Sequence, residues 1–253
     1  MLRLFVFSVI LAVVLGQDNY CSKELCGNAK HIACQNNGAW SSSCPQTPAP
    51  FLININQTLY QHISTAHNVR RNRLALGNLP GYSAARRMAT VRWNPELALL
   101  AQLNVKRCVQ QRDACHNTNT FSNSGQNVAL ITYPGDWTTK PNQELVTQAI
   151  HSWWLEYANA NMAVINSYPN NWTGATIRNF ATMAQQRNYA VGCAAARYFK
   201  DSLNHFLFAC NYAVDNEAGV PVYVAGVTAA GCQQGTNINF PGLCKFAETN
   251  FDV

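Results

Sequence analysis

The sequence predicts an α+β or layered α/β/α domain rather than a doubly wound parallel sheet. Apolar residues recur at helical spacing between residues 51 and 159, and the period shortens to two after residue 187. Strand candidates at 90–93 and 127–132 are short. Helices that precede the main strands do not give the regular strand and helix alternation of a parallel sheet. The chain of 253 residues is long enough for one sizeable domain or two small ones.

The first helix is predicted from four apolar residues that fall on one helical face. These are Leu59, Ile63, Ala66 and Val69. Thr58 precedes the first of them and is a candidate N-cap, because its hydroxyl can accept a hydrogen bond from a free backbone N–H.

Two further helices have recognisable beginnings. Asn94 followed by Pro95 is typical of a capping residue and a proline at the first helical position, and the apolar pattern runs on to Cys108. A third helix is expected at about 143–159, where Glu144 lies in the first turn and is favoured by the helix dipole.

Two strands are predicted near the end of the chain. Residues 189–198 and 206–213 alternate with period two and are joined by a polar turn at 200–204. Cys193 and Cys210 lie at positions where a disulfide could join the two strands.

The composition excludes several classes of protein. Charged residues make up only 12% of the chain, which argues against a charged coiled coil, and 48% are hydrophobic, which argues against disorder. The net charge is 18 − 12 = +6 and is spread thinly. We therefore expect no nucleic-acid partner.

The N-terminus is typical of a secretory signal peptide. Arg3 precedes an apolar stretch at 4–15, and small or β-branched residues before Gln17 predict cleavage after Gly16, so that the signal peptide covers residues 1–16. A stretch of twelve residues is too short to cross a bilayer about 30 Å thick at about 1.5 Å per residue. We expect no membrane span and a secreted, extracellular protein.

The cysteine content agrees with an oxidising compartment. An even number of cysteines in the mature chain predicts five disulfides and no free thiol; they are Cys21, Cys26, Cys34, Cys44, Cys108, Cys115, Cys193, Cys210, Cys232 and Cys244. No Cys-x-x-Cys pair is present, so a structural zinc site is not expected. Asn56 and Asn171 begin glycosylation sequons.

Residues 17–50 form a cysteine-rich segment with little apolar content. Four cysteines, several glycines and serines and three prolines lie in it, so it has too few apolar residues for a core of its own. We expect an N-terminal extension at 17–50 that is tied covalently to a main domain at 51–253.

Several motifs together resemble one family. Four stretches occur in order: Ala66-His67-Asn68-Val69-Arg70, Ser124-Gly125-Gln126-Asn127-Val128-Ala129, Trp153-Trp154-Leu155-Glu156 and Cys210-Asn211-Tyr212-Ala213. They resemble the CAP superfamily of cysteine-rich secretory, antigen 5 and pathogenesis-related proteins. Further stretches resemble the insect antigen 5 branch, especially that of flies: Tyr20-Cys21, His31-Ile32-Ala33-Cys34, Asn166-Ser167-Tyr168-Pro169 and Pro221-Val222-Tyr223.

The resemblance implies a three-layer α/β/α sandwich, the CAP fold, and a disulfide pattern. The implied pairs are Cys21 with Cys34, Cys26 with Cys115, Cys44 with Cys108, Cys193 with Cys210 and Cys232 with Cys244. The spacing of the cysteines alone does not select this connectivity.

Many relatives have a central cleft in which two histidines and two acidic residues converge, and some bind a divalent metal there. The matching positions are His67, Gln126, Glu156 and Asn179. Gln126 replaces a glutamate and Asn179 replaces a histidine, and an amide is a poor ligand for zinc or copper. We therefore assign no metal site and expect no cofactor.

His67 is expected to be a partly buried structural histidine that is hydrogen-bonded to Glu156 or to an amide. The spacing of His62, His151 and His205 suggests no shared site, and His31 and His116 adjoin cysteines that are expected in disulfides.

Catalysis is not expected, and no catalytic residue is assigned. The chain has no Gly-x-Ser-x-Gly nucleophile motif, and every cysteine is expected in a disulfide. One histidine and one glutamate can form an acid/base pair in almost any fold.

The resemblance instead implies a monomeric, secreted binding protein and potential allergen of saliva, venom or gut. Some CAP proteins carry sterols or fatty acids, and the segment 129–141, with Tyr133 and Trp137, is a candidate lip over a lipid groove. The alternatives are metal-dependent activity at the degenerate cleft and binding to a host haemostatic or immune protein. Binding to integrins through an Arg-Gly-Asp motif is not expected, because no Arg-Gly-Asp is present.

Overall fold

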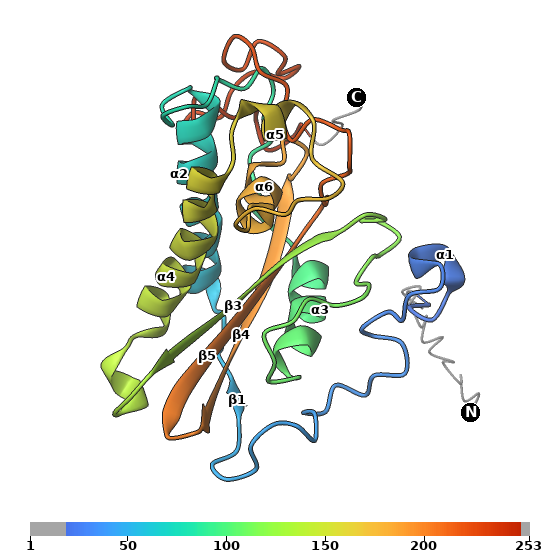
Figure 1. Ribbon diagram of the computed structural model, residues 1–253, viewed down its shortest axis with the longest axis vertical. Helices are drawn as coiled ribbons and strands as arrows, with labels where there is room; N and C mark the ends of the chain where they lie inside the picture. The colour runs from blue at the N-terminus through green and yellow to red at the C-terminus, as the bar shows by residue number, and fades with distance from the viewer. Residues whose placement is uncertain (1–18, 249–253) are drawn as a thin grey trace, which may run out of the picture.

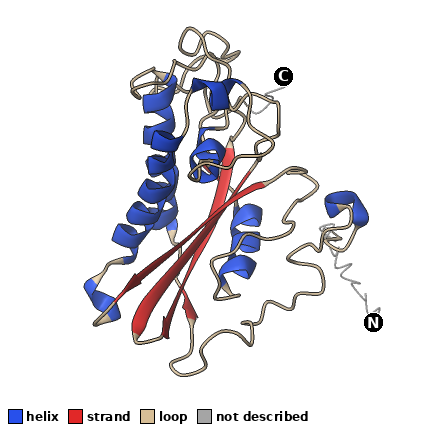
Figure 2. Ribbon diagram, viewed as in Figure 1, coloured by secondary structure: helices blue, strands red, loops and turns tan. Residues whose placement is uncertain are grey.

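The protein is a three-layer α/β/α sandwich. A computed structural model describes residues 19–248 (Figure 1). One layer contains α2 (Gln57–Ala75), α4 (Asn142–Leu155) and α6 (Arg178–Ala184), and the opposite layer contains α3 (Pro95–Val105). The sheet lies between them (Figure 2). The predicted fold class is therefore confirmed.

The central sheet has the strand order β1-β4-β5-β3. Its members are β1 (Phe51–Leu52), β4 (Ala190–Lys200), β5 (Leu203–Tyr212) and β3 (Gly125–Tyr133), and all neighbours are antiparallel. The short β2 (Arg92–Trp93) pairs with β4 in the parallel direction. Within the described chain, β3 pairs with β5 alone, so it forms one edge of the sheet.

Alternation along the strands supplies two separate apolar cores. Cys193 and Ala195 of β4 join the core under α2, α4 and α6, whereas Ala194 and Ala196 join the core under α3. Successive side chains of a strand point to opposite faces of the sheet, so one strand can serve both cores. The sheet is therefore covered on both faces, as the layered prediction requires.

The remaining helices are short. They are α1 (Lys23–Cys26), the 3-10 helices η1 (Trp137–Thr139) and η2 (Glu156–Asn159), and α5 (Met162–Asn166).

The three expected long helices are present, with corrections at their ends. α2 is capped by Asn56, whose side chain accepts from Leu59 N, so Thr58 is not the cap. Val69 is 52% exposed and does not belong to the buried face. α3 begins at Pro95 after the Asn94 cap, as expected, but it ends three residues before Cys108. The third predicted helix is divided into α4 and η2.

The predicted hairpin is present, and its turn is tighter than expected. β4 and β5 extend into the predicted polar segment 200–204 and leave Asp201 and Ser202 as the connecting residues. Both have positive φ, 52° and 61°, which suits a two-residue turn between twisted strands. Cys193 lies opposite Cys210 in the register, and the two are bonded.

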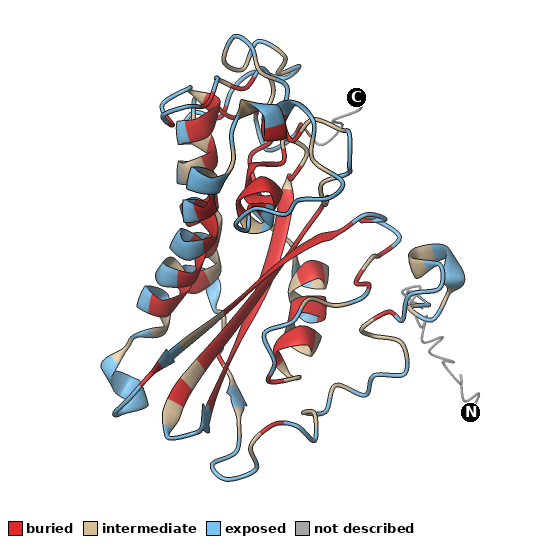
Figure 3. Ribbon diagram, in the orientation of Figure 1, coloured by how far each residue is buried: buried red, intermediate tan, exposed pale blue. Residues whose placement is uncertain are grey.

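Disulfides hold the N-terminal extension against the main domain. The structure contains the five pairs that the resemblance implies: Cys21–Cys34, Cys26–Cys115, Cys44–Cys108, Cys193–Cys210 and Cys232–Cys244. Most of the extension is exposed or intermediate (Figure 3). In the chain-entropy model, the bridges that close 89 and 64 residues contribute at most about 4 to 5 kcal/mol each.

The signal-peptide prediction falls outside the described residues. Residues 1–16 and the predicted cleavage after Gly16 precede the described range. No helix within residues 19–248 is long and apolar enough to cross a membrane.

A buried arginine connects α2 to two loops. Arg71 is fully buried. Its guanidinium donates to the carbonyl oxygens of Ala89, Met183, Gln185 and Gln186 at 2.6 to 3.4 Å. Burial lowers the pKa of Arg71 to about 9, so the side chain stays charged at neutral pH.

We predict that Arg71→Met lowers the free energy of unfolding by about 3 to 5 kcal/mol, because four carbonyls lose their donor. Guanidinium chloride unfolding with the disulfides intact measures this change. The control is Arg73→Ala on the same helix, which removes an exposed side chain and is expected to cost at most about 0.5 kcal/mol. Similar losses for the two variants would contradict the prediction.

Candidate functional site

The structure divides the four expected cleft residues among three environments. Glu156 and Asn179 are in direct contact. His67 bonds to Ile63 and Tyr212 instead. Gln126 belongs to a separate network with Asp113. Of the four residues, the hydrogen bonds therefore join only Glu156 and Asn179 to each other.

Glu156 caps the N-terminus of α6. Its Oε2 accepts from the backbone N–H of Asn179 at 2.7 Å and of Phe180 at 3.2 Å, and its Oε1 accepts from Asn179 Nδ2 at 2.5 Å. A carboxylate at this position satisfies free helix N–H groups and is favoured by the helix dipole. Both carboxylate oxygens are thus already engaged.

Arg112, which the sequence analysis did not single out, supplies a cation beside this pair. Its Nη2 donates to Asn179 Oδ1 at 2.5 Å and lies 3.5 Å from Asn127 Oδ1. Burial, together with the nearby charge of Arg178, lowers the pKa of Arg112 to about 10, so it remains protonated at neutral pH. A fixed positive charge at this place disfavours a second, divalent cation.

His67 is a buried histidine with two partners, and neither is the expected one. Its Nδ1 lies 2.8 Å from the carbonyl oxygen of Ile63, so Nδ1 carries the proton and Nε2 accepts from the Tyr212 hydroxyl at 3.0 Å. The prediction of a direct bond to Glu156 or to an amide was wrong. Burial lowers the pKa of His67 to about 4 and keeps the ring neutral.

Asn127 connects His67, through Tyr212, to the pair formed by Glu156 and Asn179. Its Nδ2 donates to Asn179 O at 3.0 Å and lies 3.3 Å from the Tyr212 hydroxyl oxygen. Asn127 therefore contacts the Glu156 and Asn179 pair, and its neighbour Gln126 does not.

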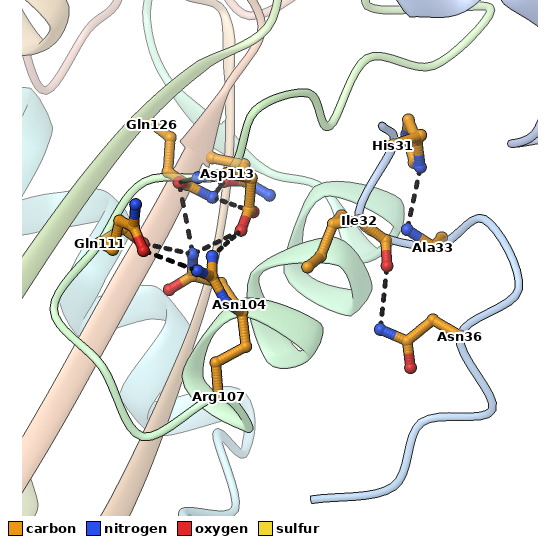
Figure 4. A network of polar contacts seen from close by, with 10 residues as sticks. His31, Ile32, Ala33, Asn36, Asn104, Arg107, Gln111, Asp113 and Gln126 are labelled. Carbon is orange, nitrogen blue, oxygen red and sulfur yellow. Dashed lines mark hydrogen bonds and ion pairs between the residues drawn. The ribbon is translucent and has the colours of Figure 1, made fainter. Parts of the chain in front are cut away.

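The environment of Gln126 explains why an amide replaces the glutamate of many relatives. Its Nε2 donates to Asp113 Oδ2 at 2.7 Å and to Asn211 Oδ1 at 2.8 Å, while its Oε1 accepts from Asp113 N at 2.8 Å. Figure 4 shows Gln126, Asp113 and Asn104 turned toward one another. A glutamate here would place its carboxylate against that of Asp113.

His31 and the cysteines near it are engaged in other interactions. His31 is buried, stacks on Tyr20 and hydrogen-bonds to Asn117 O at 2.8 Å. Two groups in the described chain bring three potential ligand atoms together: Cys26, His31 and Cys115, and Cys232, Cys244 and Glu248. In both groups the cysteines form a disulfide, so their sulfur atoms are not thiolate ligands.

Two grooves could receive a ligand. One has a volume of about 520 Å³ between β1 and α3; its lining combines the apolar residues Leu52, Ile53, Ile55, Trp93, Ala98 and Leu99 with the polar residues Asn54 and Gln102. The other encloses about 580 Å³ along β3, between α4 and the loops that carry Gln110 and Thr176.

The segment that was expected to form a lip divides into two parts. Residues 129–132 line the groove along β3. Trp137 is 49% exposed, packs edge-on against Phe51 and lies under the Arg197 guanidinium at 5.3 Å. Arg197 also donates to the carbonyls of Trp137 and Lys140, so this part is anchored to β4.

Comparison with known proteins decides the family. The model of the CAP domain, described as the cysteine-rich secretory protein family, matches residues 65–212. The chain belongs to the CAP family. The similarity read from its sequence motifs is thereby confirmed.

Relatives of this CAP protein include proteins of flies that are named as allergens. Venom allergen-1 of Aedes aegypti is 30% identical over 240 residues, which cover 94% of this chain and 92% of the relative. Antigen 5 like allergen Cul n 1 of Culicoides nubeculosus is 36% identical over 201 residues, which cover 76% of this chain and 88% of the relative. The predicted antigen 5 branch of flies is therefore confirmed.

A solved structure supports the CAP fold. The crystal structure of NaASP2 with Zn2+ superposes with a TM-score of 0.61 at 18% identity, and the match covers 80% of this chain and 100% of that chain. At this level of identity the similarity concerns the fold, and the zinc ion named there belongs to that protein.

We predict that the stability of this CAP protein falls as the pH falls from 6.5 to 4. In this window the unfolded His67 takes up a proton and the folded one does not, so the free energy of unfolding decreases by up to about 3 kcal/mol. Urea unfolding at several pH values measures it. The difference between wild type and His67→Gln isolates this contribution, and parallel pH profiles for the two would contradict the prediction.

We also predict that zinc binds the described cleft no more tightly than about 100 µM, because the Glu156 oxygens are engaged and Arg112 is adjacent. Calorimetric titration of zinc into the purified protein tests this. Micromolar affinity that is lost in His67→Ala or in Glu156→Gln would show that the cleft rearranges to bind metal.

Proposed function

We propose that the protein is secreted and acts by binding rather than by catalysis. The observation that carries this proposal is that the polar side chains of the cleft are already engaged with one another. The Glu156 carboxylate caps α6, Arg112 contacts Asn179, and the buried His67 is neutral and bonded to Tyr212. The relatives named as allergens and the five disulfides support an extracellular site of action.

We propose a small hydrophobic molecule, of the fatty acid or sterol class, as the ligand of the groove between β1 and α3. Its volume of about 520 Å³ lies in the range of small-molecule sites, about 300 to 1,000 Å³. Leu99 is 53% exposed at this groove, and Trp93 stacks on Tyr60 at one side of it. Burial of this apolar surface by a lipid chain would contribute about 0.8 kcal/mol per methylene group.

We propose glycosylation at both sequons. Asn56 and Asn171 are exposed. The cap on α2 uses the side-chain Oδ1 of Asn56, which accepts from Leu59 N, whereas a glycan is attached to the side-chain nitrogen Nδ2. The α2 cap and a glycan at Asn56 are therefore compatible.

We predict that Leu99→Glu weakens binding of a fluorescent fatty acid by about tenfold or more, because it places a carboxylate in the apolar groove. Displacement titrations with unlabelled fatty acids and sterols measure the affinity, and native mass spectrometry of protein from insect cells detects co-purified lipid. The matched control is Leu155→Glu, which adds the same charge at a residue of α4 with similar exposure, 48%.

Two results would count against this ligand. The first is a native mass spectrum without lipid together with flat displacement curves. The second is an equal loss of affinity in Leu99→Glu and Leu155→Glu, which would place the bound molecule outside the groove.

A further inference from the structure

A pocket lies where the N-terminal extension meets the loop after α3. It has a volume of about 430 Å³, and its lining comes from two segments that are far apart in the chain, within 30–37 and 107–114. Figure 4 shows residues of both segments, with His31 to Asn36 on one side and the network around Asp113 on the other. The pocket shares no lining residue with the groove between β1 and α3 or with the groove along β3.

Disulfides and backbone contacts hold the two segments of the pocket together. Cys26–Cys115 and Cys44–Cys108 tie the extension to both ends of the loop. The backbone N–H of Ile32 donates to the carbonyl oxygen of Cys115 at 2.9 Å. The pocket is therefore formed before a ligand enters, and a ligand does not have to order the chain around it.

The lining carries an excess of positive charge. Lys30, Arg107 and Arg112 line the pocket together with one acidic residue, Asp113, which gives a net charge of +2. The Lys30 side chain is exposed and makes no hydrogen bond or ion pair within residues 19–248. A concave site lined mainly by one sign of charge attracts ligands of the opposite sign.

The Asp113 carboxylate is covered by donors and does not oppose an anion. Its side chain is 1% exposed. Its Oδ1 accepts from Arg107 Nη1 at 3.0 Å and from Asn104 Nδ2 at 2.7 Å, and its Oδ2 accepts from Gln126 Nε2 at 2.7 Å. Arg107 Nη2 donates to Gln111 Oε1 at 2.9 Å. Asp113 and Gln111 therefore fix the orientation of the Arg107 guanidinium at the pocket.

Arg112 has unused donors beside the same pocket. Its Nη2 donates to Asn179 Oδ1 and lies near Asn127 Oδ1, as described above. Its Nε and Nη1 have no hydrogen-bond acceptor among residues 19–248. A guanidinium that is held by one nitrogen keeps its remaining N–H groups for a ligand.

The uncharged part of the lining suits hydroxyl groups rather than an aromatic ring. Side-chain amides of Gln35, Asn36, Asn37 and Gln111 belong to the lining, and an amide can both donate and accept. His31, the ring in the lining, is buried and already stacked on Tyr20. A nucleobase would therefore find no free ring face in the described lining to stack on.

We propose that this pocket binds the phosphate monoester of a sugar. A phosphate monoester carries about 1.5 to 2 negative charges at pH 7 and three acceptor oxygens, which match the net charge and the donors of Lys30, Arg107 and Arg112. The amides bind the sugar hydroxyls. The volume of about 430 Å³ lies in the range of small-molecule sites, about 300 to 1,000 Å³.

The test is calorimetric titration of glucose 6-phosphate into the mature protein with its disulfides intact, in a phosphate-free buffer of low ionic strength. Glucose, which has no charge, is expected to bind at least about 50-fold more weakly. Inorganic phosphate, which has no hydroxyl-rich ring, is expected to bind about tenfold more weakly. Adenosine 5′-monophosphate is expected to bind no more tightly than inorganic phosphate.

Variants place the ligand in the pocket. Lys30→Gln removes one positive charge from an exposed side chain and is expected to weaken binding of glucose 6-phosphate by about fivefold or more. Arg107→Lys keeps the charge but loses the planar fork, and it is expected to weaken binding by about tenfold. The matched control is Lys23→Gln, which removes the same charge from an exposed residue of the extension outside the pocket. It is expected to stay within about twofold of wild type.

Three results would overturn the proposal. The first is the absence of glucose 6-phosphate binding at millimolar concentration. The second is an equal loss of affinity in Lys30→Gln and Lys23→Gln, which would indicate general attraction to a basic protein. The third is glucose 6-phosphate binding no more tightly than inorganic phosphate or adenosine 5′-monophosphate.

The phosphate site and the hydrophobic-ligand site can fail separately. Fatty-acid binding by Lys30→Gln is expected to equal that of wild type, and so is binding of glucose 6-phosphate by Leu99→Glu, because the two linings share no residue. Failure of either proposal therefore leaves the other intact.

Discussion

The buried guanidinium of Arg71 is the interaction on which much of the arrangement depends. Arg71 lies on α2 and bonds to carbonyls before β2 and at the C-terminal end of α6, and these three segments are far apart in the chain. Asn68, one turn earlier, both donates to and accepts from the backbone of Val91 at 2.8 Å. These two side chains satisfy irregular backbone that would otherwise be buried without partners, and they place α6 above α2.

The position of α6 in turn determines what the cleft contains. A continuous polar chain runs from His67 through Tyr212 and Asn127 to Asn179, and Glu156 and Arg112 complete it. Most of its members are neutral, and its carboxylate and guanidinium are fixed by hydrogen bonds. Such a network is suited to holding one geometry rather than to exchanging protons or ligands.

Local sequence signals predicted the elements better than they predicted the cleft. The Asn94-Pro95 start and the period of two in β4 and β5 are properties of short segments, and they were read correctly. The Asn56 cap was missed because Asn56 and Thr58, two residues apart, are both capping residue types, and the tertiary position of the chain selects between them.

The cleft could be predicted only in part, because its contacts are tertiary. The alternation of side chains in a strand implies that Gln126 and Asn127 cannot face the same side, which is a signal the sequence contains. No comparable signal marks Arg112 in its loop, or distinguishes Arg71 from the other four arginines between residues 70 and 87. The disulfide pairs came from the family resemblance and not from spacing.

The bridges Cys26–Cys115 and Cys44–Cys108 have a topological consequence for the loop that carries Arg112. They attach both ends of the segment 108–115 to the extension, and the extension is attached at two points as well. A protease that cuts once between residues 27 and 43 therefore releases no fragment. The exposed extension can be nicked in a protease-rich fluid while the segment 108–115 stays covalently linked to both pieces of it.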